Sequence, residues 1–401
     1  MRHLFAWDND TLVGRFDEGG GRVSFEYEPD ATYPISLSLP LDGRWHEHAP
    51  AAFLEGLLPE EGAQRLYMMN SIGARSTDAF DLLDGVDSTG GLVFTTTDTP
   101  IAPVADAGIA RELDIEAQMQ RIYDAGYAWW NGDTRNRFSL AGNQGKFSLS
   151  RIGGMWFWPN ATLPSTHIIK PDGQRIPSVA AVEHASMEVA RQLGLPVANT
   201  TTIRFGEREG LLVERFDRVY DAQAQTIRRI RTEDMTQALG AWNKDKYGCE
   251  ISQLVGCLHD AGADEEACYG LVRQIVFNAG IGNSDAHAKN YSVFLGPSGI
   301  DVTPMYDVIS MAPWPEFKDD VLAMPVNGIY DPWEVTIGDW RAEAKRCALD
   351  PDRVEEIVRE IEEALHGFDY DSLPCGSRIA SAIRTHMHEC SRDLMPSLGL
   401  G

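Results

Sequence analysis

Two stretches near the start of the chain alternate apolar and polar residues, the pattern of a strand with one buried face. They are Leu-Val-Gly-Arg-Phe at 12–16 and Val-Ser-Phe-Glu-Tyr at 23–27, separated by Asp-Glu-Gly-Gly-Gly-Arg. Turn-forming residues between two alternating runs predict a β-hairpin. The N-terminal part of the chain is therefore expected to contain an antiparallel pair of strands.

The pattern changes to helical spacing over residues 51–69, with three apolar side chains on one face. A run rich in Thr, Pro and Ala then occupies residues 95–107. Such a run is typical of a connection between structural units. Residues 1–105 are therefore predicted to form a small α+β unit.

Residues 106–216 combine short strands with one helix. The helix is predicted to start after Ser178, a residue type that caps helices, and to stop at Gly194 and Pro196. These residues are expected to form a β-rich small lobe. Its strand-like runs lie at 146–150, 155–158, 166–170, 200–205 and 210–214.

Residues 217–401 are mostly helical in pattern. Apolar residues recur at i, i+3, i+4 and i+7 from Cys268 to Ala279 and again from Val354 to Leu365. A β-rich lobe followed by a helical lobe is the predicted organisation of the α+β chain.

Composition narrows the functional classes. The 401 residues include 35 Lys and Arg against 60 Asp and Glu, a formal net charge of −25. This acidity argues against broad charge-driven binding to nucleic acid or to an anionic membrane. The chain shows no signal-peptide segment, no run of membrane-spanning length and no C-x-x-C pair among six cysteines. We therefore expect a cytoplasmic protein with reduced thiols and no membrane partner.

The stretch richest in candidate chemistry is Gly-Ile-Gly-Asn-Ser-Asp-Ala-His-Ala-Lys-Asn at 280–290. It follows a predicted helix and precedes a predicted hairpin, which leads to Asp307. Helix, polar loop, hairpin and aspartate is the order of the catalytic loop and metal-binding aspartate in protein kinases. Asp285 and Asn290 also stand five apart, as in the kinase pattern H-R-D-x-x-x-x-N. The sequence therefore predicts a two-lobed, protein-kinase-like fold.

Phosphoryl transfer accounts for the residue types in this stretch. Asp285 can orient the acceptor hydroxyl and take its proton. The side-chain oxygens of Asn290 and Asp307 suit Mg²⁺ as ligands. Lys289 and His287 are expected to contact phosphate or ribose.

Two other interpretations of the stretch have less support. A purely structural loop would not need so many polar side chains within eight residues. A metal hydrolase could use Asp285, His287 and Asp307, but the sequence has neither a second ligand cluster at convincing spacing nor an H-E-x-x-H motif.

ATP would also need a loop around its phosphates and a lysine to neutralise them. Residues 138–148, Phe-Ser-Leu-Ala-Gly-Asn-Gln-Gly-Lys-Phe-Ser, offer small residues whose N–H groups can surround phosphate oxygens. Lys170 ends an apolar strand, and Glu183 in the next helix is its expected partner, as in kinases. Residues 211–217 lead out of the small lobe and form the candidate hinge. There the main chain of Glu214 and Phe216 is expected to contact adenine.

Together these features resemble the HipA family, the kinase toxins of bacterial toxin–antitoxin pairs. The resemblance covers nearly the whole chain, with the motifs in the family's order. One departure is Gly145, where many members have Pro or Glu. The motifs stand at 53–59, 79–92, 139–146, 166–171, 213–218, 233–240, 282–290 and 304–307.

The resemblance implies transfer of the ATP γ-phosphate to a serine or threonine hydroxyl, with Asp285 as the catalytic residue and Asn290 and Asp307 as Mg²⁺ ligands. Ser139 matches the serine that the family autophosphorylates, which ejects the phosphate loop and inactivates the enzyme. The residues placed around ATP are Ala141, Gly142, Asn143, Gln144, Gly145, Lys146, Lys170, Glu214, Arg215, Phe216, His287, Ala288, Lys289, Asn290, Tyr306 and Asp307.

The resemblance also implies partners. One is a small helix-turn-helix antitoxin, HipB-like, through which operator DNA would mainly be contacted. Another is a protein substrate, an aminoacyl-tRNA synthetase, whose phosphorylation halts translation and favours dormancy. Two alternatives stay open: a small-molecule or lipid kinase on the same fold, and a catalytically silent scaffold that binds the antitoxin.

Overall fold

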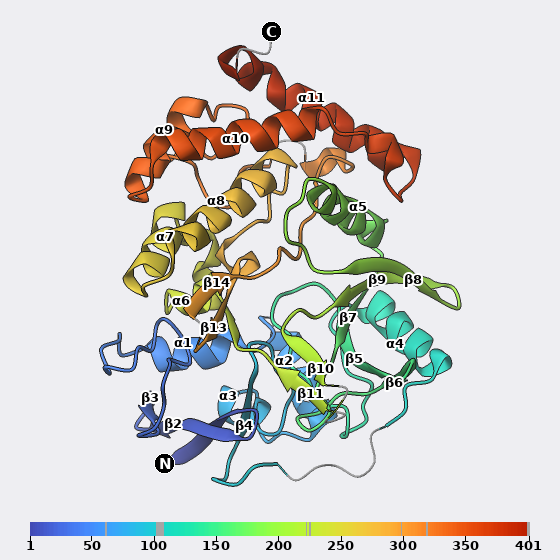
Figure 1. Cartoon of the computed structure of the whole chain (residues 1–401). Coiled ribbons are helices and arrows are strands. Elements are labelled where there is room, and N and C mark those ends of the chain that lie inside the picture. Colours follow the sequence, from blue (N-terminus) through green and yellow to red (C-terminus); the bar gives the residue numbers. More distant parts are fainter. Residues whose placement is uncertain are drawn as a thin grey trace.

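The computed structural model describes residues 1–60, 62–101, 108–221, 223, 226–297, 299–317 and 320–398, with side chains up to 389. An N-terminal unit lies at one end and a group of helices at the other, with a five-stranded sheet beside them (Figure 1). The predicted boundary at residue 105 lies outside the described residues, so it stays a prediction.

The N-terminal unit is a four-stranded antiparallel sheet in the order β3-β2-β1-β4, with three helices. The predicted hairpin is present, with Phe16 opposite Phe25. The single helical stretch predicted over 51–69 is wrong, because two helices flank Pro59, which lacks an N–H and disfavours helical geometry before it. The elements are β1 (Arg2–Asp8), β2 (Thr11–Gly19), β3 (Arg22–Tyr27), α1 (Ala49–Gly56), α2 (Gly62–Ile72), α3 (Ala79–Leu82) and β4 (Leu92–Thr95).

The small lobe is an antiparallel sheet in the order β6-β5-β7-β9-β8. Alternating residues of β9 divide between two cores: Leu211 and Val213 pack with residues of α5, and Leu212 with residues of α4. The two helices therefore cover opposite faces. The elements are α4 (Glu112–Ala125), β5 (Phe147–Ile152), β6 (Met155–Phe157), β7 (His167–Pro171), α5 (Val179–Gln192), β8 (Thr200–Phe205) and β9 (Arg208–Glu214).

Helix α5 starts where predicted, but its cap differs. Ser178 has a left-handed backbone (φ +63°) and its side chain makes no capping hydrogen bond. The Asp172 carboxylate instead accepts the N–H of Ala180 at 2.8 Å. The expectation that Ser178 caps the helix is therefore wrong.

The large lobe contains strands as well as the predicted helices, in a β10-β11 pair and a β12-β13-β14 sheet. The catalytic-loop candidate lies between α8 and β13. The elements are β10 (Arg218–Asp221), β11 (Thr226–Arg229), β12 (Thr232–Asp234), α6 (Met235–Ala238), η1 (Asn243–Gly248), α7 (Ile251–Asp260), α8 (Glu265–Gly280), η2 (Ala288–Asn290), β13 (Ser292–Gly296), β14 (Gly299–Val302), η3 (Pro315–Phe317), α9 (Ile337–Arg346), α10 (Pro351–His366), η4 (Tyr370–Ser372) and α11 (Ser377–Leu398).

Among the described residues, two large hydrophobic cores account for most of the buried apolar side chains. One joins the N-terminal unit to the α4 face of the small lobe, and the other joins α5 to the large lobe. In the described part of the chain, five cysteines are free thiols. None of the helices described here combines the length and apolar character needed to cross a membrane.

Candidate active site

Three ionisable side chains from separate segments meet between the lobes. The ammonium nitrogen of Lys170, on β7, lies 2.7 Å from Oε1 of Glu183 on α5. It also forms an ion pair with Asp307, which follows β14. Lys170 and Glu183 are buried, and a buried lysine is costly without such partners. The predicted contact between Lys170 and Glu183 is therefore present.

Asp307 combines an uncommon backbone with a stabilised charge. Its φ of +58° lies in the left-handed region, which is unfavourable for residues other than glycine and often marks a functional site. Burial acts to raise the pKa of Asp307, but the ammonium groups of Lys170 and Lys146 hold it well below its ordinary value. The carboxylate therefore stays charged at neutral pH.

Asp285 lies in the loop after α8, and its side chain is accessible to solvent. The Tyr247 hydroxyl, from η1, donates a hydrogen bond to its Oδ1 at 2.5 Å. Reduced hydration raises the pKa of Asp285 and nearby Asp307 adds to the rise, while the hydrogen bond from Tyr247 opposes it. An accessible carboxylate with a raised pKa is suited to accepting a proton.

The main chain of the same loop positions Asn290. Its amide nitrogen donates to the main-chain oxygen of Asp285 at 2.9 Å, so the amide oxygen faces the other way. His287 is buried, and no partner is described for its Nδ1. Burial lowers the pKa of His287 to about 3, so the ring is neutral at physiological pH. Ala288, the next residue, is fully buried.

Lys289 is buried and already has two partners. Its ammonium lies 2.7 Å from Oδ2 of Asp234 and donates to the main-chain oxygen of Gly56 at 3.0 Å. The expected contact of Lys289 with phosphate or ribose stays a prediction. Lys289 connects the catalytic loop to the start of α6 and to the N-terminal unit.

The predicted phosphate loop lies against the N-terminal unit. Ser139 is fully buried, and its hydroxyl donates to the main-chain oxygen of Leu57 at 2.6 Å. The amide of Gln64 donates to the main-chain oxygen of Asn143 at 3.0 Å. Residues 141–145, by contrast, are exposed or half-buried.

The end of this loop explains the glycine at position 145. A Cβ there would lie 2.5 Å from the side chain of Ile122 and 3.0 Å from the main-chain oxygen of Gly126, so no larger residue fits. The next residue, Lys146, is buried, with its ammonium 5.6 Å from the centre of the Trp129 ring. Burial lowers the pKa of Lys146 to about 8, so a nearby phosphate would stabilise its charged form.

The candidate hinge continues from the end of β9. The N–H of Glu214 donates to the main-chain oxygen of Asn199 at 2.8 Å. The Phe216 ring lies 5.8 Å from the rings of Phe294 and Tyr306, centre to centre. Phe216 and Tyr306 are thus neighbours, although they are 90 positions apart in the sequence.

Arg215 lies between the two hinge residues, and its side chain points into a buried ionic group. Its guanidinium is buried and lies 2.7 Å from Oδ2 of Asp217. The main-chain N–H of Arg215 donates to a main-chain oxygen of the small lobe. The expected place of Arg215 in the ATP site, as part of the hinge, stays a prediction. The side chain belongs to a buried ionic group, here called the Asp87 cluster, that contains Asp87, Arg215, Asp217, Arg218 and Arg229.

Three residues that position the site were not predicted individually. Asp87 and Asp234 stand within the family motifs at 79–92 and 233–240, which provided a signal for them. Tyr247 had no comparable signal, because it lies in the polar segment Asn-Lys-Asp-Lys-Tyr-Gly. Only the folded chain brings it to Asp285.

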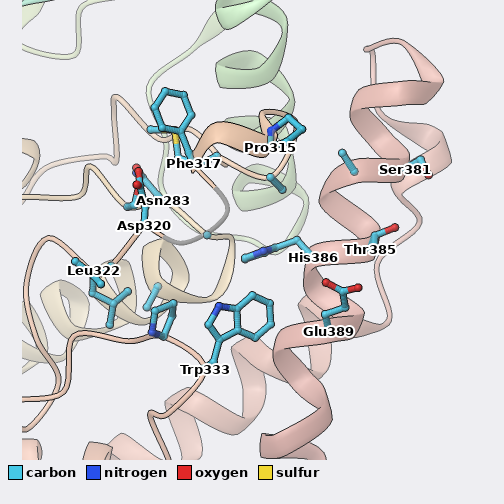
Figure 2. Close-up of a pocket in the computed structure, with 18 of the residues that line it drawn as sticks. Asn283, Pro315, Phe317, Asp320, Leu322, Trp333, Ser381, Thr385, His386 and Glu389 are labelled. Carbon is cyan, nitrogen blue, oxygen red and sulfur yellow. The ribbon is translucent and has the colours of Figure 1, made fainter. Parts of the chain in front are cut away.

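A cavity of about 480 Å³ lies beside the catalytic loop, bordered by residues from 311–317, 320–322 and 332–333 and by α11 (Figure 2). Asn283 lines one side, and the rings of Trp333 and His386 lie 5.4 Å apart at another. A Cβ on Gly282, whose φ is +77°, would lie 2.3 Å from Nε2 of His386. The C-terminal helix therefore packs directly against the start of the catalytic loop.

Comparisons with known proteins identify the family of the chain. Residues 138–367 match the HipA-like C-terminal domain, and residues 4–95 match the HipA N-terminal domain. The first match alone covers more than half of the chain.

Similar proteins match along most of their length. The serine/threonine-protein kinase toxin HipA of Shewanella oneidensis is 31% identical over 349 residues, which is 80% of this chain and 78% of that protein. Y4mE of Sinorhizobium fredii is 30% identical over 384 residues, 87% and 86% of the two chains.

The solved structure of Shewanella oneidensis HipA with HipB and operator DNA has a TM-score of 0.81 and 26% identity. The match covers 98% of this chain and 99% of that one. It confirms the predicted fold. The chain belongs to the HipA family of serine/threonine-protein kinase toxins.

Proposed function

We propose that this chain transfers the γ-phosphate of ATP to a serine or threonine hydroxyl of a protein target, and that a HipB-like antitoxin restrains it. The observation that carries this proposal is the buried contact of Lys170 with Glu183 and Asp307. It joins β7, α5 and the segment after β14 at the place where a kinase holds its nucleotide.

The proposed nucleotide site uses residues of both lobes. Lys170 and Lys146 neutralise phosphate oxygens, and the N–H groups of residues 141–145 surround them. Adenine is contacted by the main chain of Glu214 and Phe216 at the hinge.

The oxygen donors present fit a magnesium ion. The Asn290 amide nitrogen is held by Asp285, which leaves the amide oxygen to serve as a ligand. The Asp307 carboxylate stays ionised, so Asn290 and Asp307 would hold the ion together with phosphate oxygens. When bound, Mg²⁺ neutralises the negative charge that develops on the transferring phosphoryl group.

Asp285 is proposed to orient the acceptor hydroxyl and to take its proton. A bond then forms between the hydroxyl oxygen and the γ-phosphorus, the bond from that phosphorus to the bridging oxygen breaks, and ADP leaves. His287 is neutral beside this carboxylate, so it adds no positive charge that would lower the proton affinity of Asp285.

The partner proposal rests on the Shewanella oneidensis relative, whose structure contains HipB and operator DNA. We propose that a HipB-like helix-turn-helix protein binds this chain in a similar way. With a net charge of −25, the chain would contact operator DNA mainly through that partner. An aminoacyl-tRNA synthetase as the phosphorylated target stays a prediction from the family resemblance, and a cytoplasmic location stays a prediction from the sequence.

Transfer of labelled γ-phosphate from Mg²⁺-ATP to proteins of a cell lysate tests the proposal. Because a positioned base typically contributes about 10²- to 10⁴-fold, Asp285→Asn should reduce transfer by at least 100-fold. Asp301→Asn, an exposed change on β14, is the matched control and should be as active as the wild type. If the wild type and Asp285→Asn are both inactive, the scaffold alternative is favoured. Equal activity in both would contradict the role of Asp285.

A further inference from the structure

Tyr247 occupies the hydrogen-bonding position that a substrate hydroxyl would need. Its phenolic O–H donates to Oδ1 of Asp285 at 2.5 Å. A serine or threonine that gives its proton to Asp285 must donate to the same carboxylate. Tyr247 therefore imitates the acceptor hydroxyl within the free enzyme.

The Tyr247 ring packs against neighbouring side chains, but about half of the residue is exposed. Its ring meets that of His287 edge to face, with 4.9 Å between centres. The ammonium of Lys246 lies 5.3 Å from the centre of the Tyr247 ring. Tyr247 itself is 49% exposed, so it lies at the surface rather than in a core. A side chain at the surface can leave its partner without disrupting the packing of either lobe.

The short helix that carries Tyr247 is fastened to the N-terminal unit. Lys246 forms an ion pair with Glu60 at 2.8 Å. The Asn243 amide donates to the main-chain oxygen of Glu55, at the end of α1, at 2.8 Å. The backbone of η1 is thus held in place, and movement of Tyr247 is confined to its side chain.

We propose that Tyr247 is an acceptor gate, meaning a side chain that holds the acceptor position on Asp285 until a hydroxyl of a protein segment displaces it. The proposal rests on the proposed role of Asp285. Water is too small to displace the phenol by contacts of its own, whereas a bound segment adds contacts around its serine or threonine. The gate therefore favours protein acceptors over water and limits the hydrolysis of ATP when no substrate is present.

If Tyr247 is an acceptor gate, a conservative substitution there should increase the hydrolysis of ATP by water. Tyr247→Phe keeps the ring against His287 but removes the oxygen, which lets water donate to Asp285. Basal ADP release from Mg²⁺-ATP without protein substrate should rise about threefold to tenfold, since hydrogen bonds to charged groups are among the stronger ones. The KM for ATP should not change, because no proposed ATP contact is lost.

The controls separate this inference from the proposed function. Tyr220→Phe removes the hydroxyl of a similarly exposed tyrosine on β10 and should behave like the wild type. Asp285→Asn combined with Tyr247→Phe should show no rise in ADP release. If Tyr247→Phe folds with an unchanged Tm and releases ADP no faster than the wild type, while Asp285→Asn is inactive, the gate is wrong and the kinase proposal stands. If Asp285→Asn is fully active, the kinase mechanism itself fails.

Discussion

Phosphorylation of the Ser139 side chain would be linked to the position of the phosphate loop. The Ser139 hydroxyl is buried and donates to Leu57, so ATP cannot reach it in this conformation. Phosphorylation would add about two negative charges and three acceptor oxygens, for which the site beside a main-chain carbonyl offers no room or compensation. Phosphorylation of Ser139 would therefore require the phosphate loop to move away from the N-terminal unit.

Ser139→Ala should therefore keep substrate phosphorylation close to the wild-type rate and lose self-inactivation during incubation with ATP. The lost hydrogen bond should cost about 1 kcal/mol of stability, too little to unfold the chain. Activity measured against incubation time, with mass spectrometry of the chain, tests this. Ser150→Ala is the matched control, because Ser150 is also buried and donates to a main-chain oxygen, that of Pro164 at 2.7 Å. Phosphate on another residue, or inactivation of Ser139→Ala, would contradict the switch.

Single residues were predictable from sequence where their chemistry is local or follows a fixed spacing. Asp285 and Asn290 are five apart in one loop, and Lys170 precedes Glu183 by one strand-to-helix step. The partner of Lys289 could not be predicted, because Asp234 is 55 positions earlier and nothing in the catalytic loop shows that the lysine is paired with it.

Elements were predicted well where one face is buried, since burial imposes a period on the sequence. Helix α8 extends the predicted range of 268–279 by only a few residues. Helix caps and helix breaks are harder to predict from sequence, because each depends on one or two atoms. Asp172, six positions before Ser178, supplies the capping oxygen of α5.

Helix α10 contains a buried acid from which a pH dependence of stability is expected. Glu362 lies against Gly280 of α8, and its Oε2 has no hydrogen-bond partner among the described residues. Burial raises the pKa of Glu362 to about 7, from 4.5 for an ordinary glutamate. Between these values the folded state holds a proton that the unfolded state has lost. The free energy of unfolding therefore falls as pH rises through this window, by about 3 kcal/mol in total.

Glu362→Gln should remove this contribution to the pH dependence. Its thermal unfolding midpoint should decline less than that of the wild type between pH 5 and pH 8, so the variant gains relative stability at the higher pH. Glu363→Gln changes the adjacent exposed residue and should leave the wild-type profile unchanged. Parallel profiles for the wild type and Glu362→Gln would show that Glu362 does not carry this titration.

At the scale of the whole molecule, charge is distributed differently on the surface and between the lobes. The chain carries a net charge of −25, yet Lys146 and Lys170 are buried where phosphates are proposed to bind. Composition therefore indicated the acidic net charge of the chain, but it could not show that these two lysines are buried between the lobes. Composition could not reveal the contacts between units either, because they join residues from distant parts of the sequence, such as Lys289 and Gly56.

The Asp87 cluster is the most extensive of these links. Asp87, from the N-terminal unit, accepts hydrogen bonds from Arg218 and Arg229, 3.1 and 2.9 Å away. Burial acts to raise the pKa of Asp87, but these guanidinium groups hold it well below its ordinary range. Arg215, which directly precedes the hinge residue Phe216, belongs to the same cluster. The N-terminal unit is therefore joined to the candidate hinge through a buried charge.

Asp87→Asn should for this reason affect both stability and nucleotide binding. It leaves three buried guanidinium groups with only the Asp217 carboxylate, and breaking a buried pair typically costs about 3–5 kcal/mol. The unfolding midpoint should fall by several degrees, and the KM for ATP should rise as the hinge loses support. Asp371→Asn breaks the exposed pair with Arg384 and should cost less than about 1 kcal/mol. If Asp87→Asn matches that control in stability and in KM, the hinge is positioned by the packing of the small lobe alone. A loss of stability without a change in KM would limit the cluster to joining the two units.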